Sequence, residues 1–210
     1  MAEWKKLGLR FEGICTGFLG SKEQIALVKK FLEEFTGDET MVLVDPVMGD
    51  YGQPYATYTP DMCNEMKKLV EYADILTPNL TEACILTDTP YKENWEMEEA
   101  AQLAEALHQM GADKIVISGI PQGSCLTNLC YEPGQEIKLV STEKVGPARH
   151  GTGDIFSSII AADVVNGAPL EDAVRKAAEF IRICIISSIE REIPMTDGVC
   201  FEDHLGELAR

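Results

Sequence analysis

Apolar residues along the chain follow two different spacings. Consecutive apolar residues, which are typical of strands buried in a sheet, occur in the segments 11–18, 41–44, 74–76 and 114–118. Apolar residues spaced three or four apart predict helices in the segments 60–73, 80–87 and 97–110, and in the segment that follows Ser21. The pattern therefore predicts strands and helices in alternation.

Two local signals indicate where helices begin. Ser21 and Gln24 have the spacing of a capping box, in which each side chain bonds a backbone amide of the first turn. Thr59 followed by Pro60 is a favourable start, because proline fits the first turn of a helix. The first helix is expected to bury Ile25, Val28, Leu32 and Phe35. The second is expected to bury Met62, Met66, Leu69 and Ala73.

The second half of the chain adds a hairpin and more helices. The segments 125–132 and 136–145 flank Pro133-Gly134 and predict two antiparallel strands. Helices are expected over 153–166, 170–191 and 201–208. The whole pattern predicts one α/β domain over residues 1–210, with helices in layers around a mostly parallel central sheet.

Polar, acidic or glycine-containing segments follow the predicted strands. In such sheets, ligands bind at the carboxyl ends of the strands. We therefore expect these segments to meet at one edge and to form a single site. They are Thr16-Gly17-Phe18, Asp45 to Asp50, Thr77-Pro78-Asn79, Ser118-Gly119 and Gly151 to Asp154.

The segment Gly151-Thr152-Gly153-Asp154 stands at the start of an apolar helix. Backbone amides at such a start attract anions, so the segment is a candidate anion hole for a phosphoryl group. Asp154 beside it is a candidate base that accepts the proton of an attacking hydroxyl group. The alternative is an ordinary turn in which Asp154 only stabilises the first turn of the helix.

Two acidic segments are candidate metal sites. Asp45 and Asp50 lie in the turn "DPVMGD", and carboxylates with phosphates and water are ligands that Mg²⁺ accepts. Asn79 and Glu82 lie three residues apart in "TPNLTEA", so both reach the same face of a helix start. The alternatives are a solvated turn for the first pair and a capping box for the second.

Charge and cysteine content narrow the function. The 35 acidic and 18 basic residues give a net charge of −17, which disfavours nucleic acid and anionic membranes as partners. The seven cysteines form no C-x-x-C pair and favour reduced thiols in a cytoplasmic protein. The sequence has no run of 18 apolar residues and no signal-peptide pattern. The G-x-x-x-x-G-K-[ST] phosphate-binding motif does not occur.

Five motifs in this order resemble the ribokinase superfamily, and more closely its pyridoxal kinase branch. The matching pieces are "TGFLGS" (16–21), "DPVMGD" (45–50), "TPNLTEA" (77–83), "IVISG" (115–119) and "GTGDIF" (151–156). The resemblance implies a ribokinase-like three-layer α/β/α fold. It also implies ATP-dependent phosphorylation of the 5′-hydroxyl of pyridoxal, pyridoxine or pyridoxamine by a cytoplasmic homodimer that uses ATP, Mg²⁺ and K⁺.

The resemblance also assigns roles to individual residues. Asp154 would be the catalytic base, and Gly151, Thr152 and Gly153 would form the anion hole. Asp45, Asp50, Asn79 and Glu82 would organise Mg²⁺ and the phosphates. Thr77 would lie near a monovalent cation or a phosphate, Ser118 and Gly119 would line the nucleotide pocket, and Phe18 would lie near the pyridine ring.

Two alternatives to a pyridoxal kinase stay open. The similar hydroxymethylpyrimidine (phosphate) kinases of thiamin synthesis often have cysteine at the position of Asp154, so aspartate favours the pyridoxal branch. Family members also carry about 70 more residues before the equivalent of Trp4, with the first strand and part of a lid, a difference compatible with ordinary domain sizes. We therefore expect that strand and the lid region to be absent here. The second alternative is accordingly a truncated, non-catalytic chain that binds nucleotide and self-associates.

Overall fold

The fold is built on a six-stranded, mostly parallel sheet. The structure, a computed structural model, describes residues 1–209. In spatial order the strands are β1 (Gly13–Thr16), β2 (Met41–Val44), β5 (Ile75–Leu76), β6 (Lys114–Gln122), β7 (Cys125–Tyr131) and β8 (Lys138–Glu143). The pairs from β1 to β6 are parallel, whereas β6, β7 and β8 form an antiparallel meander. The predicted hairpin around Pro133-Gly134 is therefore confirmed.

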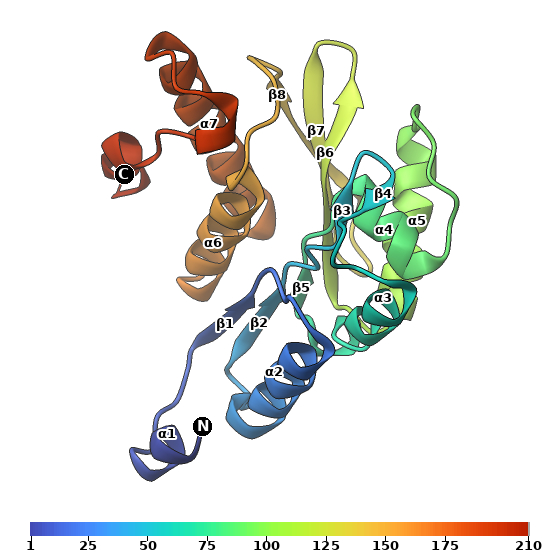
Figure 1. The fold of residues 1–210 in the computed structure, drawn as a ribbon, viewed down its shortest axis with the longest axis vertical. Coiled ribbons are helices and arrows are strands. Elements are labelled where there is room, and N and C mark those ends of the chain that lie inside the picture. The colour runs from blue at the N-terminus through green and yellow to red at the C-terminus, as the bar shows by residue number, and fades with distance from the viewer. Residues whose placement is uncertain (210) are drawn as a thin grey trace.

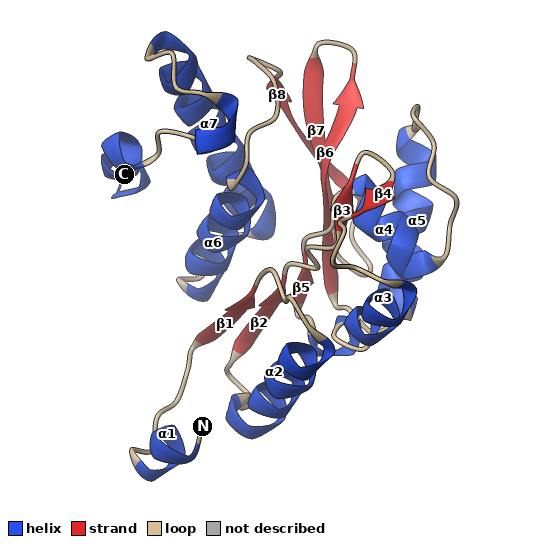
Figure 2. Cartoon of the chain, in the orientation of Figure 1, coloured by secondary structure: helices blue, strands red, loops and turns tan. Residues whose placement is uncertain are grey.

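Helices cover both faces of this sheet. In Figure 1, α6 and α7 lie on one side of the strands, and α2 to α5 lie on the other. Figure 2 shows the same three layers by type of structure. The first group is α6 (Thr152–Val165) and α7 (Leu170–Glu190). The second is α2 (Lys22–Phe35), α3 (Pro60–Lys67), α4 (Leu80–Thr87) and α5 (Met97–Gln109). The predicted three-layer α/β/α architecture is confirmed.

Two hydrophobic clusters fill the space between the layers. Side chains alternate along a strand, so neighbouring residues of β2 belong to different clusters. Leu43 packs with Val116 beneath α6 and α7. Val42 and Val44 pack with Ile115 on the side of α2 to α5. The strands are buried on both faces, which explains their continuous apolar sequences.

Several elements differ from the prediction in length. The helix predicted over 60–73 ends at Lys67, and a short 3₁₀ helix (Val70–Tyr72) follows, although Leu69 and Ala73 are buried as expected. The last predicted helix, 201–208, is a 3₁₀ helix at Glu202–Ala209. The sequence pattern missed α1 (Ala2–Lys6) and a hairpin of β3 (Gly49–Asp50) and β4 (Gln53–Pro54).

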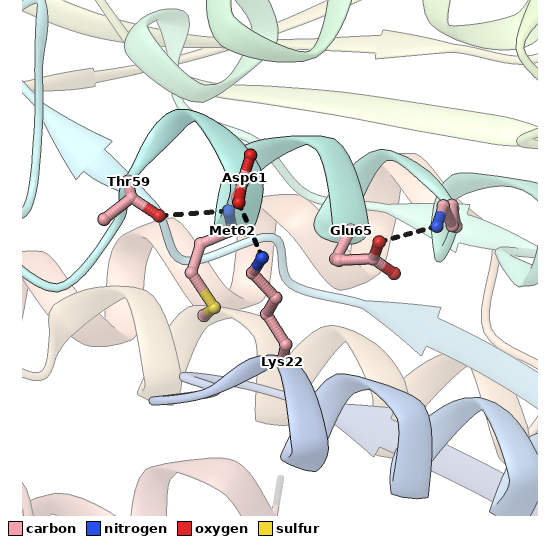
Figure 3. A network of polar contacts seen from close by, with 6 residues as sticks. Lys22, Thr59, Asp61, Met62 and Glu65 are labelled. Atoms are coloured by element: carbon pink, nitrogen blue, oxygen red, sulfur yellow. Dashed lines mark hydrogen bonds and ion pairs between the residues drawn. The ribbon is translucent and has the colours of Figure 1, made fainter.

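Both predicted helix starts have a side-chain cap. Ser21 accepts a hydrogen bond from the Gln24 amide, whereas the Gln24 side chain bonds the amide of Gly20 rather than that of Ser21. Figure 3 shows the Thr59 hydroxyl accepting from the amide of Met62 at the start of α3. In the same view Lys22, from the first turn of α2, forms an ion pair with Asp61 of α3.

The N-terminal segment packs on α2 and leaves one edge of the sheet free. Trp4 contacts the rings of Phe11, Phe31 and Phe35, with centroids 5.7 to 6.2 Å apart. β1 pairs with β2 on one side and is the end strand of the order. A groove of about 1150 Å³ follows this edge and is lined by the segments 8–15 and 34–40 and by Ala161, Ala162 and Val165 of α6. Within residues 1–209, no helix has the length and apolar content needed to cross a membrane.

Gly49 provides a test of the small hairpin. A Cβ at this position would lie 2.8 Å from Cα of Pro54 and against the carbonyl oxygen of Gln53, so the backbone would have to move. We expect Gly49→Ala to lower the free energy of unfolding in urea by about 1–3 kcal/mol, as overpacking does. Gly206→Ala is the matched control, because a Cβ there meets open space. Equal stability of the two variants would contradict this account.

Candidate active site

The carboxyl ends of β1, β2 and β5 lie at one edge of the sheet, and the segments that follow them lie together there, beside the middle of β6. Asn79, in the loop after β5, and Ser118, which lies within β6 rather than after it as the sequence predicted, form an isolated parallel bridge. Asp45 and Thr77, which come after β2 and β5, both lie within hydrogen-bond distance of Ser157 on α6. The Asp45 amide also donates to the carbonyl of Thr16, and Ser157 donates to the carbonyl of Gly153, so a few hydrogen bonds connect all five polar segments.

The first turn of α6 presents backbone amides to open space. Gly151 caps the helix with φ +81°, a left-handed conformation that favours glycine. The helical hydrogen bonds begin with the Ile155 amide donating to the Gly151 carbonyl, so the three preceding amides have no partner within the helix. A Cβ at Gly151 or Gly153 would meet nothing within 4 Å. An anion therefore has room to approach these amides.

Asp154 lies at this opening. It is exposed, and its Oδ1 would be 3.7 Å from a Cβ built on Gly17, in the loop after β1. The Thr152 hydroxyl, by contrast, donates to the carbonyl of Arg149 and is engaged in the loop itself. The carboxylate of Asp154 therefore stands beside the free amides and faces the loop that follows the edge strand.

Asp45 is a buried carboxyl group close to Asp154. Its Oδ2 accepts a hydrogen bond of 2.8 Å from the Ser157 hydroxyl. The pKa of Asp45 is raised from 3.8 to about 7, chiefly by burial and also by the charge of Asp154, although the hydrogen bond from Ser157 lowers it. An acid held in an unfavourable environment of this kind is typical of functional sites.

Asn79 and Glu82 form the capping box that the sequence allowed as an alternative. The Asn79 side chain accepts from the Glu82 amide, and Glu82 Oε2 accepts from the Asn79 amide at 2.8 Å. Glu82 Oε1 also accepts from the Met48 amide at 3.1 Å, and the Asn79 side-chain amide donates to the Gly49 carbonyl. The pair thus holds the loop that follows Asp45. Burial raises the pKa of Glu82 well above its ordinary value.

The remaining predicted residues lie around this centre. Asp50 is exposed and its carboxylate accepts from the amide of Tyr51. Phe18 is 53% exposed and packs edge-on against Tyr58. The Gly119 amide donates to the side chain of Asn128. The role predicted for each of these residues, and for Ser118 and Thr77, stays a prediction.

Within residues 1–209, no group of three or more His, Cys, Asp or Glu side chains is placed to hold a metal ion. Glu82 uses both carboxylate oxygens on backbone amides. The carboxylate of Asp45 is a ligand type that Mg²⁺ accepts, together with phosphates and water. The metal roles of Asp45, Asp50, Asn79 and Glu82 stay predictions.

Sequence reasoning missed two residues that hold the site together. Ser157 joins Asp45 to α6, and its only signal was a small polar residue on the inner face of an apolar helix. Arg149 is 8% exposed and donates to the carbonyls of three residues beyond α7, so it fixes the entry to the glycine loop. These are the carbonyls of Ile193, Pro194 and Gly198.

Comparison with known proteins gives consistent matches. The family model of phosphomethylpyrimidine kinase matches residues 7–197. A hydroxymethylpyrimidine/phosphomethylpyrimidine kinase of Haemophilus influenzae is 33% identical over 174 residues, which are 80% of this chain and 63% of that protein. A pyridoxine/pyridoxal/pyridoxamine kinase of Bordetella avium is 29% identical over 175 residues, 80% of this chain and 57% of that protein. The chain thus spans less than two thirds of either relative.

A solved structure agrees with these matches. It is the crystal structure, with pyridoxal, of a Bacteroides thetaiotaomicron protein described as a phosphomethylpyrimidine kinase. Its TM-score is 0.94 at 33% identity, and the match covers 100% of this chain and 74% of that one. The predicted fold class and the resemblance to pyridoxal kinases are both confirmed.

The pKa of Asp45 predicts how stability depends on pH. Because the pKa is raised in the folded chain, the carboxyl favours folding at low pH, and this contribution is lost as the pH rises from about 4 to about 7. We expect Asp45→Asn to raise the free energy of unfolding, in urea with a chelator, by roughly 1–4 kcal/mol at about pH 8, and by less at about pH 5. For the exposed Asp50→Asn we expect a change within about 0.5 kcal/mol. A gain for Asp45→Asn that is equal at both pH values would be evidence against this account.

Proposed function

The chain belongs to the phosphomethylpyrimidine kinase family, and from this membership we propose that it transfers the γ-phosphoryl group of ATP to the 5′-hydroxyl of pyridoxal, pyridoxine or pyridoxamine. One observation carries the proposal. An exposed carboxylate, Asp154, stands beside the free amides of a helix start that is open to solvent. Free amides by themselves account only for the binding of an anion. A carboxylate beside them can also accept the proton of a hydroxyl group that attacks a bound phosphate.

The proposed mechanism uses these groups in turn. The amides at Gly151, Thr152 and Gly153, together with the free amide of Asp154, hold the oxygens of the transferred phosphoryl group, where negative charge develops. Asp154 accepts the proton of the acceptor hydroxyl as its oxygen bonds to phosphorus. The bond between the γ-phosphorus and the bridging oxygen breaks, and its electron pair leaves with ADP. Mg²⁺, when bound, supplies positive charge to the phosphates, and Asp45 is the residue that would hold it.

A hydroxymethylpyrimidine or phosphomethylpyrimidine substrate is the second candidate. It is favoured by the name of the matching family and by the Haemophilus influenzae relative. The pyridoxal substrates are favoured by Asp154, by the Bordetella avium relative and by the pyridoxal in the Bacteroides thetaiotaomicron crystal. Both reactions use the same base and the same anion hole. Turnover of the purified chain with ATP, measured on each alcohol in parallel, decides between them, and no turnover on either favours the non-catalytic alternative.

Removing the carboxylate of Asp154 tests the base. We expect Asp154→Asn to lower the turnover rate by roughly two to four orders of magnitude, the usual effect of losing a general base, while calorimetry shows nucleotide affinity unchanged. Asp172→Asn is the matched control, because Asp172 is also an exposed acid in the first turn of a helix. If Asp154→Asn only lowers the melting temperature and leaves turnover near the wild-type rate, Asp154 is a helix-stabilising charge and the mechanism is wrong.

The proposal includes self-association as a homodimer through the free edge of β1. An unpaired strand edge favours pairing with a second chain. We expect sedimentation to give twice the chain mass of 23.1 kDa. Cys15 is exposed on β1, so a lysine there places a charge on the edge, and Cys15→Lys should shift the protein to monomer. Leu27→Lys, at an exposed position of α2, should not. A wild-type protein that sediments only as monomer would disprove the dimer.

A further inference from the structure

Ser157 is a buried hydroxyl group at the contact between three elements of the candidate site. It is 2% exposed and lies on the inner face of α6, in a helix that is otherwise largely apolar. Its Oγ is 2.8 Å from Asp45 Oδ2, 3.3 Å from Thr77 Oγ1 and 3.0 Å from the carbonyl oxygen of Gly153. The residue therefore connects the end of β2 and the end of β5 to the first turn of α6.

The contact with Gly153 acts on the anion hole. The carbonyl of Gly153 belongs to the same planar peptide unit as the amide of Asp154. A hydrogen bond that fixes the direction of this carbonyl therefore also fixes the direction of that amide, which is one of the three without a helical partner. Ser157 contacts neither the open space at the helix start nor the Asp154 carboxylate, so its effect on an anion there passes through the backbone.

The contact with Asp45 ties the same peptide unit to the buried carboxyl group. A serine hydroxyl has one proton and two lone pairs, so Ser157 shares its proton between Asp45 and Gly153 while it is able to accept from Thr77. A buried carboxylate and a buried hydroxyl both cost free energy when left unpaired. The arrangement is therefore stable only while the end of β2 and the first turn of α6 keep their present distance.

We propose that Ser157 is a positioning residue for phosphoryl transfer. It holds the Gly153–Asp154 peptide unit and the Asp45 carboxyl in a fixed relation, so that the anion hole is already oriented before nucleotide binds. This inference rests on the proposed function and deepens it, since it names the group that orients the amides. Misplacement of catalytic groups by about 1 Å can lower a rate about 100-fold, so a positioning residue is expected to act on turnover more than on affinity for the acceptor.

A neighbouring serine provides a matched control. Ser158 makes the same kind of hydrogen bond, from its Oγ to the carbonyl of Asp154 four residues earlier, at 2.7 Å. It is exposed, on the outer face of α6. Replacing it removes a serine-to-carbonyl bond in the same turn of the helix but leaves the connection to Asp45 in place.

The test compares Ser157→Ala, Ser157→Cys and Ser158→Ala with the wild-type chain. Cysteine keeps approximately the volume of serine but is a weak donor, so it separates loss of the hydrogen bond from loss of packing. Turnover number and acceptor KM are measured with ATP, the affinity for ADP by calorimetry, and the folded fraction by circular dichroism at the assay temperature. We expect both Ser157 variants to lose roughly 10–100-fold in kcat with acceptor KM within about twofold, and Ser158→Ala to behave as wild type.

Two results would overturn the inference. In the first, both Ser157 variants keep wild-type kcat and ADP affinity. In the second, kcat falls only in proportion to the folded fraction, or Ser157→Cys restores it, and the residue then contributes packing alone. Failure of the proposed function is recognised separately, because the wild-type chain itself would then show neither turnover nor binding of ADP.

Discussion

Parallel strand pairing is the constraint on which the site depends. β1, β2, β5 and β6 run in the same direction, so their carboxyl ends lie at one edge of the sheet. Loops that are far apart in the sequence meet at this edge. The first turn of α6, which belongs to the helical layer formed by α6 and α7, lies against them. The bond between Ser157 and Asp45 joins positions 112 residues apart. The chemistry of the site therefore arises from this convergence, and a single motif such as "GTGD" supplies only part of it.

Elements with a local signal were predictable from the sequence. β2 and α4 have the bounds that their patterns indicate, because an apolar run and a capping box are contained within a few residues. The β3–β4 hairpin has strands of two residues, which are too short to show an alternation. α3 ends early because its last amides bond three residues back, as in a 3₁₀ helix, while the apolar side chains beyond it stay buried.

The site was predictable as a set of residues but not as a set of contacts. The spacing of Asn79 and Glu82 allowed both a cap and a metal site. The structure has the capping box, and the Met48 amide, from another loop, binds the second oxygen of Glu82, a contact that no local spacing indicates. Ser157 had no motif, since its partners come from two distant strand ends. In general, the type of a residue and its place after a strand are local properties, whereas its hydrogen-bond partners are set by packing.

The burial of Arg149 has a consequence for the electrostatic potential of the site. Its side chain carries a full positive charge into the interior, and its hydrogen bonds go to backbone carbonyls beyond α7. Carbonyl dipoles compensate a charge only in part, so some of its field extends to the glycine loop that begins two residues later. In a chain with a net charge of −17, this is a positive charge close in sequence to the amides at which we propose a phosphate binds. An anion that approaches this loop would therefore meet less repulsion than the net charge of the chain alone implies.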